Sequence, residues 1–187
     1  MTTGREIVLV GGGARSGKSA FALARARELG VRRLFIATAR RYDAEMDDRI
    51  ARHRAERAQE FETLEEPLAV PEVLGRATGY DVAVVDCVTL WLSNQLIDGA
   101  GQDEIERRVR DLAVALERAP CHVVLVTNEV GMGVHPESAL GRTFRDVAGR
   151  AHQRLASVAT EIQLAVLGVV LRLAPGPIAV HHRGARG

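Results

Sequence analysis

The sequence predicts a single α/β domain in which a mainly parallel β-sheet is covered by helices on both faces. Three observations support this fold class. Short apolar runs of strand type alternate with stretches of helical spacing along the chain. The runs at 81–86 and 122–127 are almost entirely apolar, as strands buried on both faces are. A glycine-rich loop separates the first strand from the first helix, and parallel sheets bind their ligands beyond the carboxyl ends of the strands.

The first half of the chain supplies five predicted elements in order. Residues 6–11 form a short apolar run that ends in glycines, which predicts the first strand. Residues 18–29 have helical spacing and stop before a glycine, which predicts a helix. Residues 33–38 predict a second strand and 44–59 a second helix that follows an aspartate N-cap. A short helix is expected at 71–77.

The second half repeats the alternation. The apolar run at 81–86 predicts the third strand, and 90–97 is expected to be helical. Residues 103–118 predict an amphipathic helix. The Val/Leu run at 122–127 predicts the fourth strand, and 138–159 a long helix with one apolar face.

The C-terminal part is expected to close the sheet. Two short runs on either side of Gly168, at 161–167 and 169–173, predict the last strands. Residues 175–187 contain Pro, Gly, His and Arg without periodicity, which predicts a loose tail. We therefore expect one domain over residues 1–174, followed by this tail.

The composition excludes several classes of protein. The 187 residues suffice for one domain and hardly for two. Lys and Arg number 25 against 24 Asp and Glu, and this balance argues against a dedicated nucleic-acid-binding protein. The apolar runs are too short to span a membrane, and the N-terminus lacks the pattern of a secretory signal. Cys87 and Cys121 are too few for a disulfide framework; we expect both to be buried, in a cytoplasmic protein.

The loop after the first strand fits the G-x-x-x-x-G-K-[ST] motif of phosphate-binding loops. Its backbone N–H groups can converge on phosphate oxygens, and the following helix N-terminus adds a partial positive charge. Lys18, the one lysine among the 25 basic residues, is expected to reach the β- and γ-phosphates, and Ser19 to hold Mg²⁺. A glycine-rich turn with a chance GKS is the alternative. The predicted nucleotide-binding residues here are Gly12, Gly13, Ala14, Arg15, Ser16, Gly17, Lys18 and Ser19.

Polar residues end the other strands at the same predicted edge of the sheet. Asp86 follows the third strand and is interpreted as an acid that binds Mg²⁺, directly or through water; a simple turn is the alternative. Thr38 ends the second strand, and the fourth runs into Thr127, Asn128 and Glu129. For Asn128 and Glu129 two roles stay open, which are substrate binding and ordering of their own loop.

One predicted helix carries a histidine between two arginines. Arg49, His53 and Arg57 are four residues apart, so they share one helical face. The two guanidinium groups disfavour protonation of the imidazole, which keeps it neutral and nucleophilic at neutral pH. They would also attract a phosphate. A solvated surface histidine is the alternative, and the spacing alone favours it.

Several longer segments together resemble one enzyme family. The loop GGARSGKS is followed by RIARH at 49–53, DCVTLWLSN at 86–94, and TNEVGMG at 127–133, which runs into FRD at 144–146. This pattern resembles the bifunctional adenosylcobinamide kinase / adenosylcobinamide-phosphate guanylyltransferase family of cobalamin biosynthesis, over about residues 6–173. Many families share the phosphate loop, whereas the R-I-x-x-H and TNEVGMG blocks are much more specific.

The resemblance implies two reactions. ATP or GTP phosphorylates the aminopropanol hydroxyl of adenosylcobinamide, and GTP then transfers GMP to that phosphate, giving adenosylcobinamide-GDP and pyrophosphate. The resemblance makes His53 the residue that carries GMP covalently, and it implies a homotrimer. It also implies guanine-nucleotide contacts outside the loop, at Thr38, Arg54, Ala55, Glu56, Arg57, Glu65 and Asp86. Among these, a carboxylate such as Glu65 suits guanine, because it can accept hydrogen bonds from the N1–H and N2–H₂ groups of the base.

Two other functions are compatible with the phosphate loop. A monofunctional small-molecule kinase would use the same loop and would not need His53. A nucleotide-gated regulatory protein or a recombinase-like ATPase would also bind nucleotide, although the near-neutral charge counts against DNA binding. Covalent labelling of the protein by GTP separates the bifunctional enzyme from both.

Overall fold

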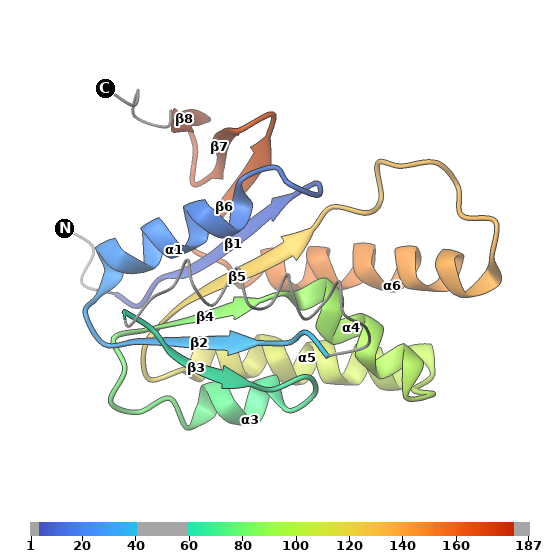
Figure 1. Ribbon diagram of the computed structural model, residues 1–187, viewed down its shortest axis with the longest axis horizontal. Coiled ribbons are helices and arrows are strands. Elements are labelled where there is room, and N and C mark those ends of the chain that lie inside the picture. Colours follow the sequence, from blue (N-terminus) through green and yellow to red (C-terminus); the bar gives the residue numbers. More distant parts are fainter. Residues whose placement is uncertain (1–3, 41–59, 182–187) are drawn as a thin grey trace.

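The protein folds into an eight-stranded sheet with helices on both faces (Figure 1). The computed structural model describes residues 4–40 and 60–181. The strand order is β3-β2-β4-β5-β1-β6-β7-β8, in which the first six strands are parallel and the pairs β6–β7 and β7–β8 are antiparallel. The predicted fold class is confirmed. The strands are β1 (Ile7–Gly12), β2 (Arg33–Ala37), β3 (Glu62–Glu65), β4 (Val82–Asp86), β5 (His122–Asn128), β6 (Glu161–Val166), β7 (Val169–Ala174) and β8 (Ala179–His181).

Two hydrophobic cores lie on opposite faces of the sheet, because successive strand residues point to opposite sides. On one face, valines of the central strands such as Val84 and Val124 pack against α1 (Lys18–Leu29). On the other face, residues such as Leu9 and Leu125 pack against four helices. These helices are α3 (Val70–Gly75), α4 (Val88–Ile97), α5 (Gln102–Arg118) and α6 (Ala139–Ala156).

Most predicted elements are present, with their ends shifted by a few residues. Two strands are additional. β3 was not predicted because its sequence ETLE is polar; it forms by pairing in parallel with β2. β8 lies in the tail that was expected to be loose, and this expectation is wrong for residues 179–181, which pair with β7. The predicted helix at 44–59 lies outside the described residues.

The turn after α1 is held by the carboxylate of Asp81, the residue directly before β4. Asp81 accepts hydrogen bonds from the backbone N–H groups of Val31 and Arg32, at 3.0 and 2.8 Å, and from the Arg32 guanidinium. These donors lower the pKa of Asp81 to about 2. Gly30 passes directly over this group, since a Cβ at Gly30 would lie 2.2 Å from the Cβ of Asp81.

Replacing Gly30 with alanine is therefore expected to lower the free energy of unfolding by about 2 kcal/mol, because the new methyl group collides with a side chain near its backbone. Urea unfolding measures the change. The matched control is Gly149→Ala in the interior of α6, where an added Cβ meets nothing within 4 Å. That change should raise stability by up to about 1 kcal/mol. Equal effects of the two substitutions would contradict the prediction.

Candidate active site

The phosphate loop is fixed at both ends, because it leaves β1 at Gly12 and enters α1 at Lys18. A Cβ at Gly12 would lie 2.5 Å from the Ala165 carbonyl oxygen and 2.7 Å from Ser16 Oγ, so only glycine fits there. Gly17 has a φ of +94°, which glycine adopts without strain. The Ser16 hydroxyl is buried and has no hydrogen-bond partner within residues 4–40 and 60–181. A buried hydroxyl of this kind suits a ligand oxygen.

Lys18 lies over the loop that precedes it. Its side chain is 7% exposed, and Nζ donates a hydrogen bond to the Gly13 carbonyl oxygen at 3.1 Å. Burial raises the pKa of the neighbouring Cys87 thiol to about 11, with the Asp86 charge acting in the same direction and the Lys18 charge in the other. The Cys87 thiol is therefore neutral at neutral pH, and the charges of Lys18 and Asp86 both act on it.

The strand register brings the predicted polar residues to one edge of the sheet. Ala37 of β2 is paired with Glu65 of β3 on one side and with Asp86 of β4 on the other. Further along, Asn128 of β5 is paired with Gly12 of β1. The expectation that the ends of the second, third and fourth predicted strands share the carboxyl edge is confirmed, and Glu65 joins this edge through the unpredicted strand β3.

Thr38 binds the backbone of the turn that follows β4. Its hydroxyl donates to the Cys87 carbonyl oxygen at 2.8 Å and accepts from the Cys87 N–H at 2.7 Å. The Thr38 N–H donates to the Asp86 carbonyl oxygen at 3.1 Å. The fully buried side chain thus holds the turn that carries Asp86, while a nucleotide contact from Thr38 stays a prediction.

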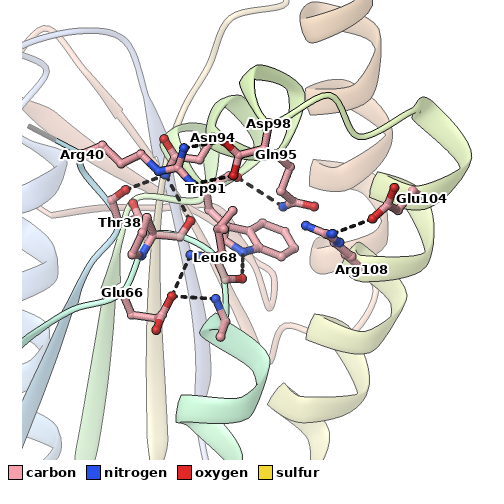
Figure 2. Close-up of polar contacts among 12 residues, drawn as sticks. Thr38, Arg40, Glu66, Leu68, Trp91, Asn94, Gln95, Asp98, Glu104 and Arg108 are labelled. Atoms are coloured by element: carbon pink, nitrogen blue, oxygen red, sulfur yellow. Dashed lines mark hydrogen bonds and ion pairs between the residues drawn. The ribbon is translucent and has the colours of Figure 1, made fainter. Parts of the chain in front are cut away.

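Side chains at the C-terminal end of α4 bond to the segments that follow the strands at this edge (Figure 2). Asn94 donates from Nδ2 to the carbonyl oxygens of Thr38 and Pro67, at 2.8 and 3.1 Å. Arg40 and Asp98 form two parallel hydrogen bonds of 2.6 Å. These contacts tie the segments that follow β2 and β3 to one helix, which fixes the position of the strand end bearing Glu65.

The segment after β5 orders the start of the phosphate loop. The Glu129 N–H donates to the Gly12 carbonyl oxygen at 3.0 Å, and the Glu129 carboxylate accepts from the Gly131 N–H at 2.6 Å. Both bonds support the loop-ordering role for Glu129, while substrate binding by Glu129 stays a prediction. His152 of α6 also contacts the end of β5, where its Nε2 lies 2.7 Å from Thr127 Oγ1. No local sequence signal places His152 here, because α6 reaches β5 only through the tertiary fold.

Burial lowers the pKa of His152, and the nearby Glu129 carboxylate only partly opposes this effect. The folded protein therefore binds this proton more weakly than the unfolded chain, whose histidine titrates near 6.5. Because the unfolded chain then binds more protons, the free energy of unfolding falls as the pH decreases through and below that value.

The variant His152→Gln should flatten the stability profile between about pH 5 and pH 7.5. Urea unfolding at a series of pH values measures it. His135→Gln, in the exposed part of the loop before α6, is the control and should keep the wild-type slope. Equal slopes for wild type and His152→Gln would show that His152 does not titrate as described.

Several predicted site residues lie outside the described residues, namely His53, Arg54, Ala55, Glu56 and Arg57. In the described part, no group of three or more His, Cys, Asp or Glu side chains is placed to hold a metal ion. Ser19 and Asp86 are nevertheless compatible with Mg²⁺, which commonly uses one or two protein oxygens together with phosphate and water.

Two further expectations can be compared with the structure. Cys87 and Cys121 are free and buried, as expected. Among the described helices, none combines the length and apolar character needed to cross a bilayer.

A solved structure of another protein shares the fold at low sequence identity. The RadB recombinase superposes with a TM-score of 0.50 and 16% identity, over 94% of this chain and 86% of that chain. At this identity the likeness shows the fold alone.

Sequence comparisons are more informative. The profile of the cobinamide kinase / cobinamide phosphate guanyltransferase family matches residues 8–173. The bifunctional adenosylcobalamin biosynthesis protein CobU of Escherichia coli (strain K12) is 39% identical over 180 residues, covering 89% of this chain and 99% of that protein. The bifunctional adenosylcobalamin biosynthesis protein CobP of Pseudomonas aeruginosa is 41% identical over 176 residues, covering 93% and 99%. These matches confirm the resemblance drawn from the motifs, and the chain therefore belongs to the cobinamide kinase / cobinamide phosphate guanyltransferase family.

Proposed function

We propose that this protein phosphorylates adenosylcobinamide with ATP or GTP and then transfers GMP from GTP to the product, at the edge that carries the phosphate loop. The observation that carries the proposal is this loop, with its buried Ser16 hydroxyl, at the same edge of the sheet as Asp86 and Glu65, in a chain that matches the family over residues 8–173. The RadB likeness concerns the fold and lends no support to a recombinase-like role.

In the kinase step, the loop N–H groups and Lys18 bind the β- and γ-phosphates. Mg²⁺, held by Ser19 and Asp86, neutralises phosphate charge when it is bound. Lys18 Nζ lies 3.1 Å from the Gly13 carbonyl oxygen, so it is already over the loop that receives the triphosphate. Positioning and charge neutralisation account for most of what phosphoryl transfer requires.

In the guanylyl step, we assign the nucleophile to His53. A ring nitrogen attacks the α-phosphorus of GTP, and the bond to pyrophosphate breaks. An oxygen of adenosylcobinamide phosphate then attacks the same phosphorus, which releases the imidazole and forms adenosylcobinamide-GDP. We propose that Glu65 accepts hydrogen bonds from guanine, and that Thr38 and Arg54–Arg57 contribute to the nucleotide site.

The direct test incubates the purified protein with adenosylcobinamide, GTP and Mg²⁺ and follows the products by mass spectrometry. We expect adenosylcobinamide phosphate first and adenosylcobinamide-GDP afterwards. A reaction that stops at the phosphate would identify a monofunctional kinase. Hydrolysis of GTP without any corrinoid product would favour a regulatory ATPase or GTPase.

We further propose a homotrimer in the cytoplasm. A corrinoid is larger than a domain of 187 residues readily encloses, so neighbouring subunits would complete its site, and free thiols such as Cys87 and Cys121 are usual in a reducing compartment. Light scattering at micromolar concentration should give a mass near that of three 20.3 kDa chains. A monomer under those conditions would contradict the trimer.

A further inference from the structure

The end of β5 lies between the two elements that handle phosphate. In the sheet, β5 is the strand between β4, which ends in Asp86, and β1, which leads into the phosphate loop. Asn128 is the last residue of β5 and is paired with Gly12, whereas Asp86 is paired with Val126, two residues earlier. Asn128 therefore extends further beyond the carboxyl edge than Asp86 does, directly beside the first residue of the loop.

Contacts to α4 fix how the Asn128 amide is oriented. The backbone N–H and the side-chain Nδ2 of Asn128 both donate to Thr89 Oγ1, at 3.2 and 3.1 Å. Since these two bonds occupy the acceptor capacity of that oxygen, the Thr89 hydroxyl donates to Cys87 Sγ, 3.1 Å away. Thr89 and Cys87 are both buried, so the amide nitrogen is held from behind.

The opposite end of the amide is its oxygen, Oδ1. None of the residues that the structure describes donates a hydrogen bond to Asn128 Oδ1, and the side chain is half-buried at the sheet edge. An amide oxygen accepts a hydrogen bond from a hydroxyl and repels a phosphate oxygen. Phosphate oxygens have their own donors here, in the loop N–H groups and Lys18. Asn128 Oδ1 is therefore matched to a hydrogen-bond donor of the ligand, and the donor that the kinase step brings to this edge is the acceptor hydroxyl.

We propose that Asn128 orients the acceptor hydroxyl of the corrinoid for the kinase step. This inference rests on the proposed function and assigns Asn128 the substrate-binding role. Asn128 Oδ1 accepts the hydroxyl proton in a hydrogen bond, which directs an oxygen lone pair at the γ-phosphorus. The new O–P bond forms as the bond to the departing nucleoside diphosphate breaks, and the hydroxyl proton passes to solvent. The neutral amide takes no proton, so its contribution is alignment.

The variant Asn128→Ala tests this role. We expect kcat for adenosylcobinamide phosphorylation to fall by about 100-fold, while KM for the nucleotide stays unchanged. Formation of the covalent GMP adduct from GTP alone should keep its rate, because that half-reaction uses no alcohol. Thr89→Val removes the oxygen that fixes the amide nitrogen and should lower the same kcat by about 10-fold. Asn128→Ser, which keeps a short hydroxyl near Thr89, should lose as much as the alanine variant.

The outcomes separate this inference from the proposed function. If the wild-type protein makes no adenosylcobinamide phosphate, the proposed function fails. If it does, and Asn128→Ala works at the wild-type rate, only the role of Asn128 is wrong. Equal losses in phosphorylation and GMP labelling would show a structural role, and a raised nucleotide KM would show that the amide binds phosphate instead. Either result overturns the inference.

Discussion

The variant Lys18→Ala is expected to lower both adenosylcobinamide phosphorylation and GMP transfer by at least about 100-fold, with the fold intact. Lys18 is the one lysine in the sequence, so no other ammonium group can replace it. It is held over the phosphate loop by the Gly13 carbonyl oxygen. Removing the side chain deletes the positive charge that both reactions need as negative charge moves onto the departing phosphate group. Product formation under saturating nucleotide measures the loss, and circular dichroism verifies the fold.

The conservative variant Lys18→Arg sharpens the test. Arginine keeps the charge but presents a wider, planar group that does not fit the position of one ammonium nitrogen. We expect a loss nearly as large as with alanine, even though this chain uses arginine for 24 of its 25 basic residues. A folded alanine variant with near wild-type rates would rule out the assigned role.

The variant His53→Asn is expected to abolish the covalent GMP label and guanylyl transfer, while phosphorylation of adenosylcobinamide persists at least in part. Asparagine approximates the size of the imidazole and keeps hydrogen-bonding capacity, but it has no nucleophilic nitrogen. The kinase step uses no histidine nucleophile, so the two activities should separate. Incubation with α-³²P-GTP followed by denaturing electrophoresis detects the adduct, which should be labile to acid and comparatively stable to base.

The structure narrows the other candidates for the nucleophile. His122 begins β5, at the end of the strand opposite to the phosphate loop, and its Nδ1 accepts a hydrogen bond from the Glu6 N–H. His152 is engaged with Thr127 Oγ1. His135, in the exposed loop before α6, provides the control variant His135→Asn, which should keep the label. A label on purified His53→Asn would show that the nucleophile was misassigned.

Much of the fold could be predicted because its central strands are strongly apolar and alternate with helices of clear periodicity. β3 and β8 were missed because neither has that pattern; each forms by pairing with a strand that is already in the sheet. Such pairing depends on tertiary structure, which local composition does not contain.

The site likewise has parts that a local sequence pattern identifies and parts that form only through tertiary contacts. The phosphate loop could be identified from sequence because its chemistry is carried by consecutive residues. The hydrogen bonds between Thr38 and Cys87 join residues 49 positions apart, and the contact between Thr127 and His152 joins residues 25 positions apart. Neither has a local signal. The TNEVGMG block indicated that Asn128 and Glu129 matter, but only the structure shows that Asn128 bonds to Thr89 whereas Glu129 bonds to Gly12 and Gly131.

The bond between the Glu129 N–H and the Gly12 carbonyl oxygen has a consequence for how the molecule moves. A long connection leads from β5 to α6 (Figure 1) and carries the exposed side chains of Met132 and Val134. It begins at Glu129, whose N–H bonds to the first residue of the phosphate loop. We expect that a large substrate which displaces this connection also shifts the Gly12 backbone, because the two share this hydrogen bond. Hydrogen–deuterium exchange at the Glu129 amide is therefore expected to slow when nucleotide orders the loop, because this amide bonds to the first residue of the loop.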